Sequence, residues 1–75
     1  MNENQFGLKA KTRQYGYVEF GKLVDRHTQK SKAGKLFNHD EDVLSVCVFD
    51  HIGQAHLYLK KDPVTGKCVK REELR

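Results

Sequence analysis

Aromatic rings and positive charges alternate in the second half of the chain, a combination that suits contact with nucleic acid. One face of a predicted hairpin carries Phe49, His56, Tyr58 and Lys60, and Lys70 joins them from the following strand. Such a face binds single-stranded nucleic acid, because bases stack on the rings while ammonium groups meet phosphates. The alternative is that the N-terminal segment covers this face, which would make the rings ordinary core residues.

A second group of cations lies in residues 25–35, DRHTQKSKAGK, where no hydrophobic period is visible. We expect an exposed basic loop there, which could include one helical turn. Its cations would contact phosphates without reading sequence, so changing Lys30 or Lys32 to alanine should weaken the salt dependence of binding. The alternative is a solvated loop whose charge keeps the protein soluble. Together, the predicted nucleic-acid-binding residues are Arg26, Lys30, Lys32, Lys35, His56, Tyr58, Lys60 and Lys70.

Metal binding and catalysis have little support in the sequence. The four histidines and two cysteines supply ligand types, but they form no Cys-x-x-Cys or His-x-x-x-His pair of the kind that structural zinc sites use. His56 and Asp50 could be written as a catalytic dyad, but the predicted strand spacing does not bring them together. A domain of this size also has little room for a water-excluding pocket. We therefore predict no enzyme, no metal and no cofactor.

The two cysteines, Cys47 and Cys68, are expected to remain unpaired. A strand separates them in the predicted meander, and second-neighbour strands lie about 10 Å apart, which is too far for a disulfide. No apolar run approaches the roughly 18–20 residues that span a bilayer, and the first residues lack the apolar core of a signal peptide. A cytoplasmic protein without a membrane partner is expected, with both thiols reduced.

The elements that position these residues centre on the stretch from Asp42 to Leu59, which is rich in β-branched and aromatic residues. We predict a hairpin that turns at Ile52-Gly53, with Val48 opposite Leu57 and Asp50 opposite Ala55. A slip of one residue would exchange the two faces, so the hydrophobic pattern fixes this register. The predicted apolar face comprises Val46, Val48, Ala55, Leu57 and Leu59.

Two further segments are predicted to be strands. Residues 15–24, YGYVEFGKLV, favour a strand over a helix because Gly16 and Gly21 would each cost about 1 kcal/mol inside a helix. Residues 67–71 follow an Asp-Pro turn and would form a third strand of the meander, with Val69 opposite Leu59. Val69 would then join the apolar face, and Cys68 and Lys70 would join the opposite one.

The chain of 75 residues is long enough for one domain. We expect residues 1–14 to be a mobile basic arm, although Phe6, Leu8 and Ala10 alternate as in a strand, and Lys9, Lys11 and Arg13 could also meet phosphates. Residues 15–71 would form a single small β-rich domain and residues 72–75 a short tail. The predicted fold class is mainly β: a small antiparallel meander or an SH3-like or OB-like barrel of four to five strands. The barrel is preferred, and a sheet with one short helix is the alternative.

A net charge of +4 favours an acidic partner. The leading hypothesis is a small non-enzymatic binding module whose partner is DNA or RNA. The alternative is a protein–protein interaction module or small regulator that pairs through an open sheet edge with a partner or with its own copy, as a homodimer. A structural accessory of a larger assembly is the third hypothesis.

Overall fold

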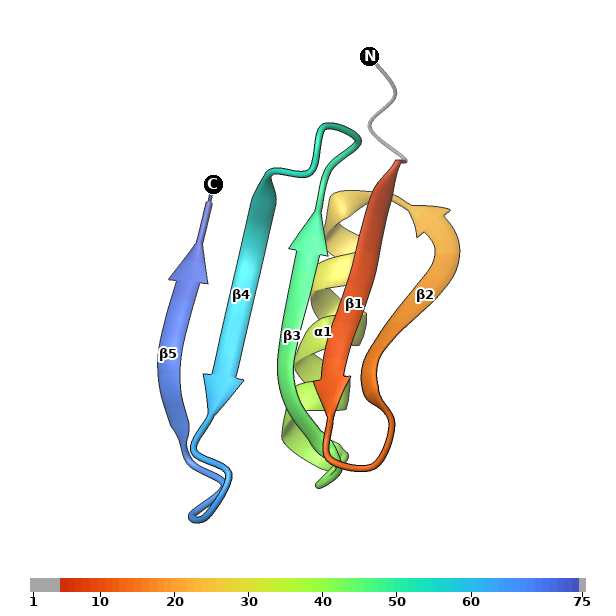
Figure 1. The fold of residues 1–75 in the computed structure, drawn as a ribbon. Coiled ribbons are helices and arrows are strands. Elements are labelled where there is room, and N and C mark those ends of the chain that lie inside the picture. The colour runs from red at the N-terminus through yellow and green to blue at the C-terminus, as the bar shows by residue number, and fades with distance from the viewer. Residues whose placement is uncertain (1–4, 75) are drawn as a thin grey trace.

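Five antiparallel strands form one open sheet, and a helix packs against one of its faces (Figure 1). The computed structural model describes residues 5–74, in which the chain runs β1 (Phe6–Thr12), β2 (Gly16–Val24), α1 (Arg26–His39), β3 (Val43–Phe49), β4 (Ala55–Lys61) and β5 (Cys68–Glu73). The strand order is β2-β1-β3-β4-β5, so α1 carries the chain from β2 across β1 to β3. The predicted mainly-β class and strand number are confirmed. The sheet stays open, so the helix-on-sheet alternative formed and the preferred barrel did not.

The predicted register of the central hairpin is confirmed where the strands are regular. Val46 pairs with Leu59, and Val48 pairs with Leu57. The register then shifts, so that Phe49, and not Asp50, lies opposite Ala55. His56 is the extra residue of this bulge, so Ala55, on its other side, does not point to the same face as Leu57. The placement of Ala55 on the apolar face was therefore wrong.

The last strand begins one residue later than predicted and pairs in a different register. Arg71, not Val69, lies opposite Leu59, and the register is irregular between Lys60 and Lys61. The preceding turn sets this offset, because the Asp62 side chain accepts hydrogen bonds from the backbone of Val64 and Thr65. Val69 is consequently 59% exposed and does not extend the core. Glu72 and Glu73, expected in the tail, belong to β5.

The N-terminal segment lies inside the sheet. Residues 6–12, which were expected to belong to a mobile arm, form β1 between β2 and β3, and Leu8 and Ala10 are almost fully buried. The alternation of Phe6, Leu8 and Ala10 indicated a strand as the alternative to a mobile arm, and that strand is observed. Residues 1–4 of the predicted arm, and residue 75 of the predicted tail, lie outside the described residues. The strand prediction for residues 15–24 is confirmed by β2.

The segment predicted as a basic loop is instead most of α1, and that prediction was wrong. Asp25 begins the helix: its carboxylate accepts hydrogen bonds from the Thr28 backbone N–H at 3.0 Å and from the Thr28 hydroxyl at 2.7 Å. The helix buries a narrow stripe of Gln29, Ala33 and Phe37. A stripe with a single large apolar residue gives almost no helical periodicity in the sequence.

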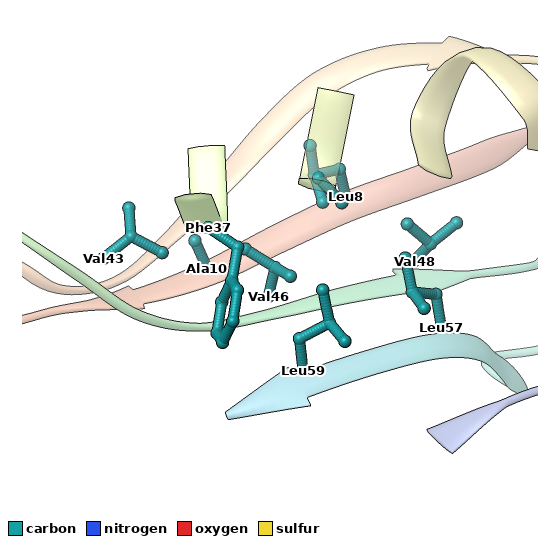
Figure 2. Close-up of a cluster of buried hydrophobic side chains, with 9 residues drawn as sticks. Leu8, Ala10, Phe37, Val43, Val46, Val48, Leu57 and Leu59 are labelled. Carbon is teal, nitrogen blue, oxygen red and sulfur yellow. The ribbon is translucent and has the colours of Figure 1, made fainter. Parts of the chain in front are cut away.

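The hydrophobic core lies between α1 and the sheet, as Figure 2 shows for the side chains that it labels. The predicted apolar positions Val46, Val48, Leu57 and Leu59 are all buried in it. The other buried members are Leu8, Ala10, Ala33, Phe37 and Val43. Since α1 packs on one side of the sheet only, the other side is left without a covering element in residues 5–74 (Figure 1). No helix in this part of the chain is long and apolar enough to cross a membrane.

Candidate functional site

The side of the sheet turned away from α1, called the open face below, is organised in two rows that cross all five strands. Residues in register on neighbouring strands point to the same side of a sheet. The first row, called the lysine row, contains Tyr17, Lys11, Ser45, Lys60 and Lys70 in spatial order. The second, called the mixed row, contains Glu19, Lys9, Cys47, Tyr58 and Glu72. Beyond the mixed row lie Gly7, Phe49 and Ala55.

Each aromatic ring of the open face has a lysine ammonium group close to it. The lysine comes from the neighbouring strand in every case, and the Nζ atom lies within cation–π range of the ring centroid. The pairs are Lys11 with Tyr17 at 5.6 Å, Lys9 with Phe49 at 5.6 Å, and Lys70 with Tyr58 at 5.8 Å. These ring–lysine pairs place an apolar plane and a positive charge side by side at three points of the face.

The three rings differ in exposure. Tyr17 is on the edge strand β2 and is 75% exposed. Tyr58 and Phe49 are half-buried, and the Phe49 ring covers Gly7, where a Cβ atom would collide with the ring. Neither ring is a core residue, so the alternative in which the N-terminal segment covers this face does not hold for the described residues.

The eight predicted binding residues divide between the two sides of the sheet. Tyr58, Lys60 and Lys70 lie together on the open face. The four cations of the supposed basic loop lie on α1, on the opposite side. His56 belongs to neither group, since its side chain is only 11% exposed and its ring meets that of Phe6 edge-on, with centroids 4.9 Å apart.

Two of the helix lysines already have partners within the fold. The ammonium group of Lys30 donates to Glu73 Oε2 at 3.0 Å and to the Leu74 carbonyl at 3.0 Å, which ties α1 to the end of the chain. The same contact holds the pKa of the Glu73 carboxyl below its ordinary value. Lys32 lies on the other flank of the helix, with Nζ 4.8 Å from the ring centroid of Phe20.

The bulge at the start of β4 brings His56 and Asp50 into contact, contrary to the expectation from strand spacing. His56 Nε2 lies 2.9 Å from Asp50 Oδ2, and His56 Nδ1 is buried without a hydrogen-bond partner. This hydrogen bond is the main reason why the pKa of Asp50 is lowered, and backbone N–H groups of the loop add to the effect. The pair joins the end of β3 to the start of β4.

Three residues that contribute to the open face were not predicted from the sequence to lie on it. Lys9 and Lys11 were placed in a mobile arm, and Tyr17 was not selected at all. The signal for the two lysines was present, because they alternate with the buried residues Leu8 and Ala10. Once residues 6–12 are a strand, a period of two places both lysines on the face opposite the core.

The helix side of the sheet carries a groove of about 400 Å³ between α1 and strands β4 and β5. Its lining includes His27, Lys30, Gly34, Leu57, Cys68 and Arg71. Cys68 therefore lies on the helix side, not beside Lys70 on the opposite face as predicted. Cys47 and Cys68 are both free, on opposite sides of the sheet. Within residues 5–74, no group of three His, Cys, Asp or Glu side chains could hold a metal ion.

The fold and its surface define a small helix-on-sheet domain with one cationic, aromatic face. Comparisons with protein families, with curated proteins and with solved structures find no match for this chain.

Proposed function

We propose that the protein binds nucleic acid on the open face of its sheet. The observation that carries this proposal is the lysine row, in which Lys11, Lys60 and Lys70 cross the sheet without a carboxylate in the same register. Phosphate groups of a nucleic acid are bound by such exposed ammonium groups, and the release of counterions drives the association. The neighbouring rings offer surfaces on which bases stack.

The open face is favoured over the helix cations as the main contact. Lys60 and Lys11 are exposed and point to the side that no described element covers. Lys30, in contrast, donates to Glu73, so a phosphate would have to replace a carboxylate that is already in place. Arg26 and Lys35 on α1 are exposed but lie across the sheet from the rings.

Replacing Lys60 by glutamine tests the proposal. We expect weaker binding of a fluorescent oligonucleotide, measured by anisotropy between about 50 and 200 mM salt, and a salt slope that is lower by about 0.7–0.9 because one phosphate contact is lost. Lys35→Gln removes the same charge from the exposed helix and should change neither the affinity nor the slope appreciably. No measurable binding at low salt, or equal losses in the two variants, would overturn the proposal.

Pairing at a sheet edge is the second candidate, because β5 has only β4 as a neighbour and all of its residues are exposed. A strand of another protein, or of a second copy of this chain, could hydrogen-bond to that edge. Sedimentation equilibrium checks the homodimer. A mass of twice the monomer that falls to the monomer mass when Val69 is replaced by proline supports it, since proline removes a backbone donor. A monomer at all concentrations rules the homodimer out.

A further inference from the structure

We infer that the ligand of the open face is an unpaired strand, DNA or RNA, and that it runs across the β-strands along the lysine row. This inference rests on the proposed function and adds the class and the direction of the ligand. Three features carry it: the width of the face, the ring–lysine pairs and the positions of the carboxylates.

The width of the open face is unsuited to reading a duplex. Five strands at the usual spacing extend about 19 Å from β2 to β5, whereas the major groove of B-DNA is about 12 Å wide and admits a helix or a two-stranded ribbon. A duplex could touch the face only with its phosphates. The rings would then have no base to stack on, because paired bases are stacked inside the helix.

The ring–lysine pairs supply what one nucleotide of an unpaired strand needs. A base stacks on the ring while the neighbouring ammonium group meets the phosphate. The rings of Tyr17 and Tyr58 lie on β2 and β4, and their lysine partners, Lys11 and Lys70, both belong to the lysine row. Lys9, the partner of Phe49, belongs to the mixed row. One base for each of the two tyrosine rings gives a footprint of about two nucleotides, within the range of one sheet-based module.

The positions of the carboxylates favour one direction for the bound nucleic-acid strand. Glu19 and Glu72 stand at the two ends of the mixed row, on the edge strands. A sugar–phosphate backbone that ran parallel to β2 or β5 would approach one of these carboxylates. A sugar–phosphate backbone that followed the lysine row would meet only Tyr17, Ser45 and three lysines. Glu72 also lies 3.8 Å from Lys70, but this ion pair is more than half exposed and contributes little.

Replacing Tyr17 by leucine tests the class of ligand. Because the ring is exposed on an edge strand, the fold should be unaffected, while the affinity for oligothymidylate and oligouridylate should fall about 5- to 150-fold. The affinity for a duplex of equal length should be weak in the wild type and the same in the Tyr17→Leu variant. Tyr15→Leu is the matched control, since Tyr15 is 72% exposed but lies in the turn outside both rows. A duplex that binds as tightly as the single strand would overturn the inference.

Charge variants on β1 and β5, in opposite halves of the lysine row, test the direction. Lys11→Gln and Lys70→Gln should each lower the salt slope for a single strand by about 0.7, and Glu72→Gln should raise the affinity. A strand running along β1 would instead make Lys9 and Lys11 important and Lys70 irrelevant. That result would overturn the direction.

Protection of the two cysteines from alkylation shows whether a negative result contradicts this inference alone or also the proposed function. Alkylation is followed by mass spectrometry at alkaline pH, because burial raises the pKa of the Cys47 thiol. A single strand on the open face should protect Cys47 and leave Cys68, on the helix side, reactive. Protection of Cys47 by a duplex to the same degree would retain the proposed function and overturn the inference. Protection of Cys68 alone would overturn both.

Discussion

Gln29 shows how one side chain can determine a helix position in a small domain. The residue is 1% exposed, and its Nε2 donates to the Phe6 carbonyl at 2.7 Å and to the Lys22 carbonyl at 3.0 Å. These carbonyls lie where the β1–β2 register shifts, between Phe6 and Leu8. A buried acceptor without a partner costs about 1–3 kcal/mol, so this amide compensates for the irregularity of the sheet. Nothing in the order of residues marks Gln29 as buried.

Gly34 and Gly16 should respond in opposite directions to replacement by alanine. Gly34 lies inside α1, and a Cβ added there would have no atom within 4 Å apart from its chain neighbours and the helix backbone, so Gly34→Ala should stabilise the protein by about 0.5–1 kcal/mol. Gly16 has a φ of 69°, so Gly16→Ala should destabilise it by about 1–2 kcal/mol. Urea unfolding followed by circular dichroism measures both. A destabilised Gly34→Ala variant would mean that the helix depends on a contact absent from this structure.

The loop between β3 and β4 depends on one carboxylate. Asp50 Oδ1 accepts from the backbone N–H groups of Ile52 at 3.1 Å and Gln54 at 2.8 Å, while Oδ2 meets His56. The bulge follows from these contacts, because they fix the loop before the strands resume their register. A sequence pattern of period two cannot anticipate an extra residue, and the prediction for Ala55 failed for that reason.

Because the pKa of Asp50 is lowered in the folded protein, its ionised form contributes stability above the ordinary value of 3.8. That contribution is lost as the pH falls through the folded-state pKa, since the carboxylate must be protonated. We expect the free energy of unfolding to decline less steeply in Asp50→Asn than in the wild type between about pH 5 and pH 2. Urea titrations across this range measure the difference.

Glu41→Gln is the control for the Asp50 variant, because it removes a carboxylate from an exposed position of the chain. Equal declines in the wild type and in Asp50→Asn would show that the Asp50 contacts do not favour the folded state. The loss of stability at low pH would then come from other carboxylates, such as Asp62 and Glu73, whose pKa values are also lowered.

The elements that the sequence predicted well are those with strong local patterns. The apolar alternation around Val46 and Leu57 fixed one face of the hairpin, and glycines with positive φ occur at predicted turns, at Gly53 and Gly66. Helix α1 was missed because its buried stripe contains one large apolar residue. β1 was left uncertain because a short strand with two lysines resembles a basic arm until a partner on each side is known.

At the scale of the molecule, the candidate site was predictable in composition but not in arrangement. The sequence identified rings and lysines on the β3–β4 hairpin, and Tyr58, Lys60 and Lys70 do lie together. It could not show that the sheet lies between the helix cations and those rings. That separation depends on which side of the sheet the β2–α1–β3 crossing takes, and no single residue of the chain records it.

The strand order also has a consequence for how the chain folds. Three of the four strand pairings in the described residues join neighbours in sequence, and such hairpins form in about 1–10 μs. The fourth, β1 with β3, joins strands that β2 and α1 separate in sequence, so closing its loop costs more entropy. We therefore expect two locally formed halves, β1–β2–α1 and β3–β4–β5, whose docking limits the folding rate. A contact of Arg13 would form only when the halves dock, because its guanidinium group, in the first half, donates to the Pro63 carbonyl of the second.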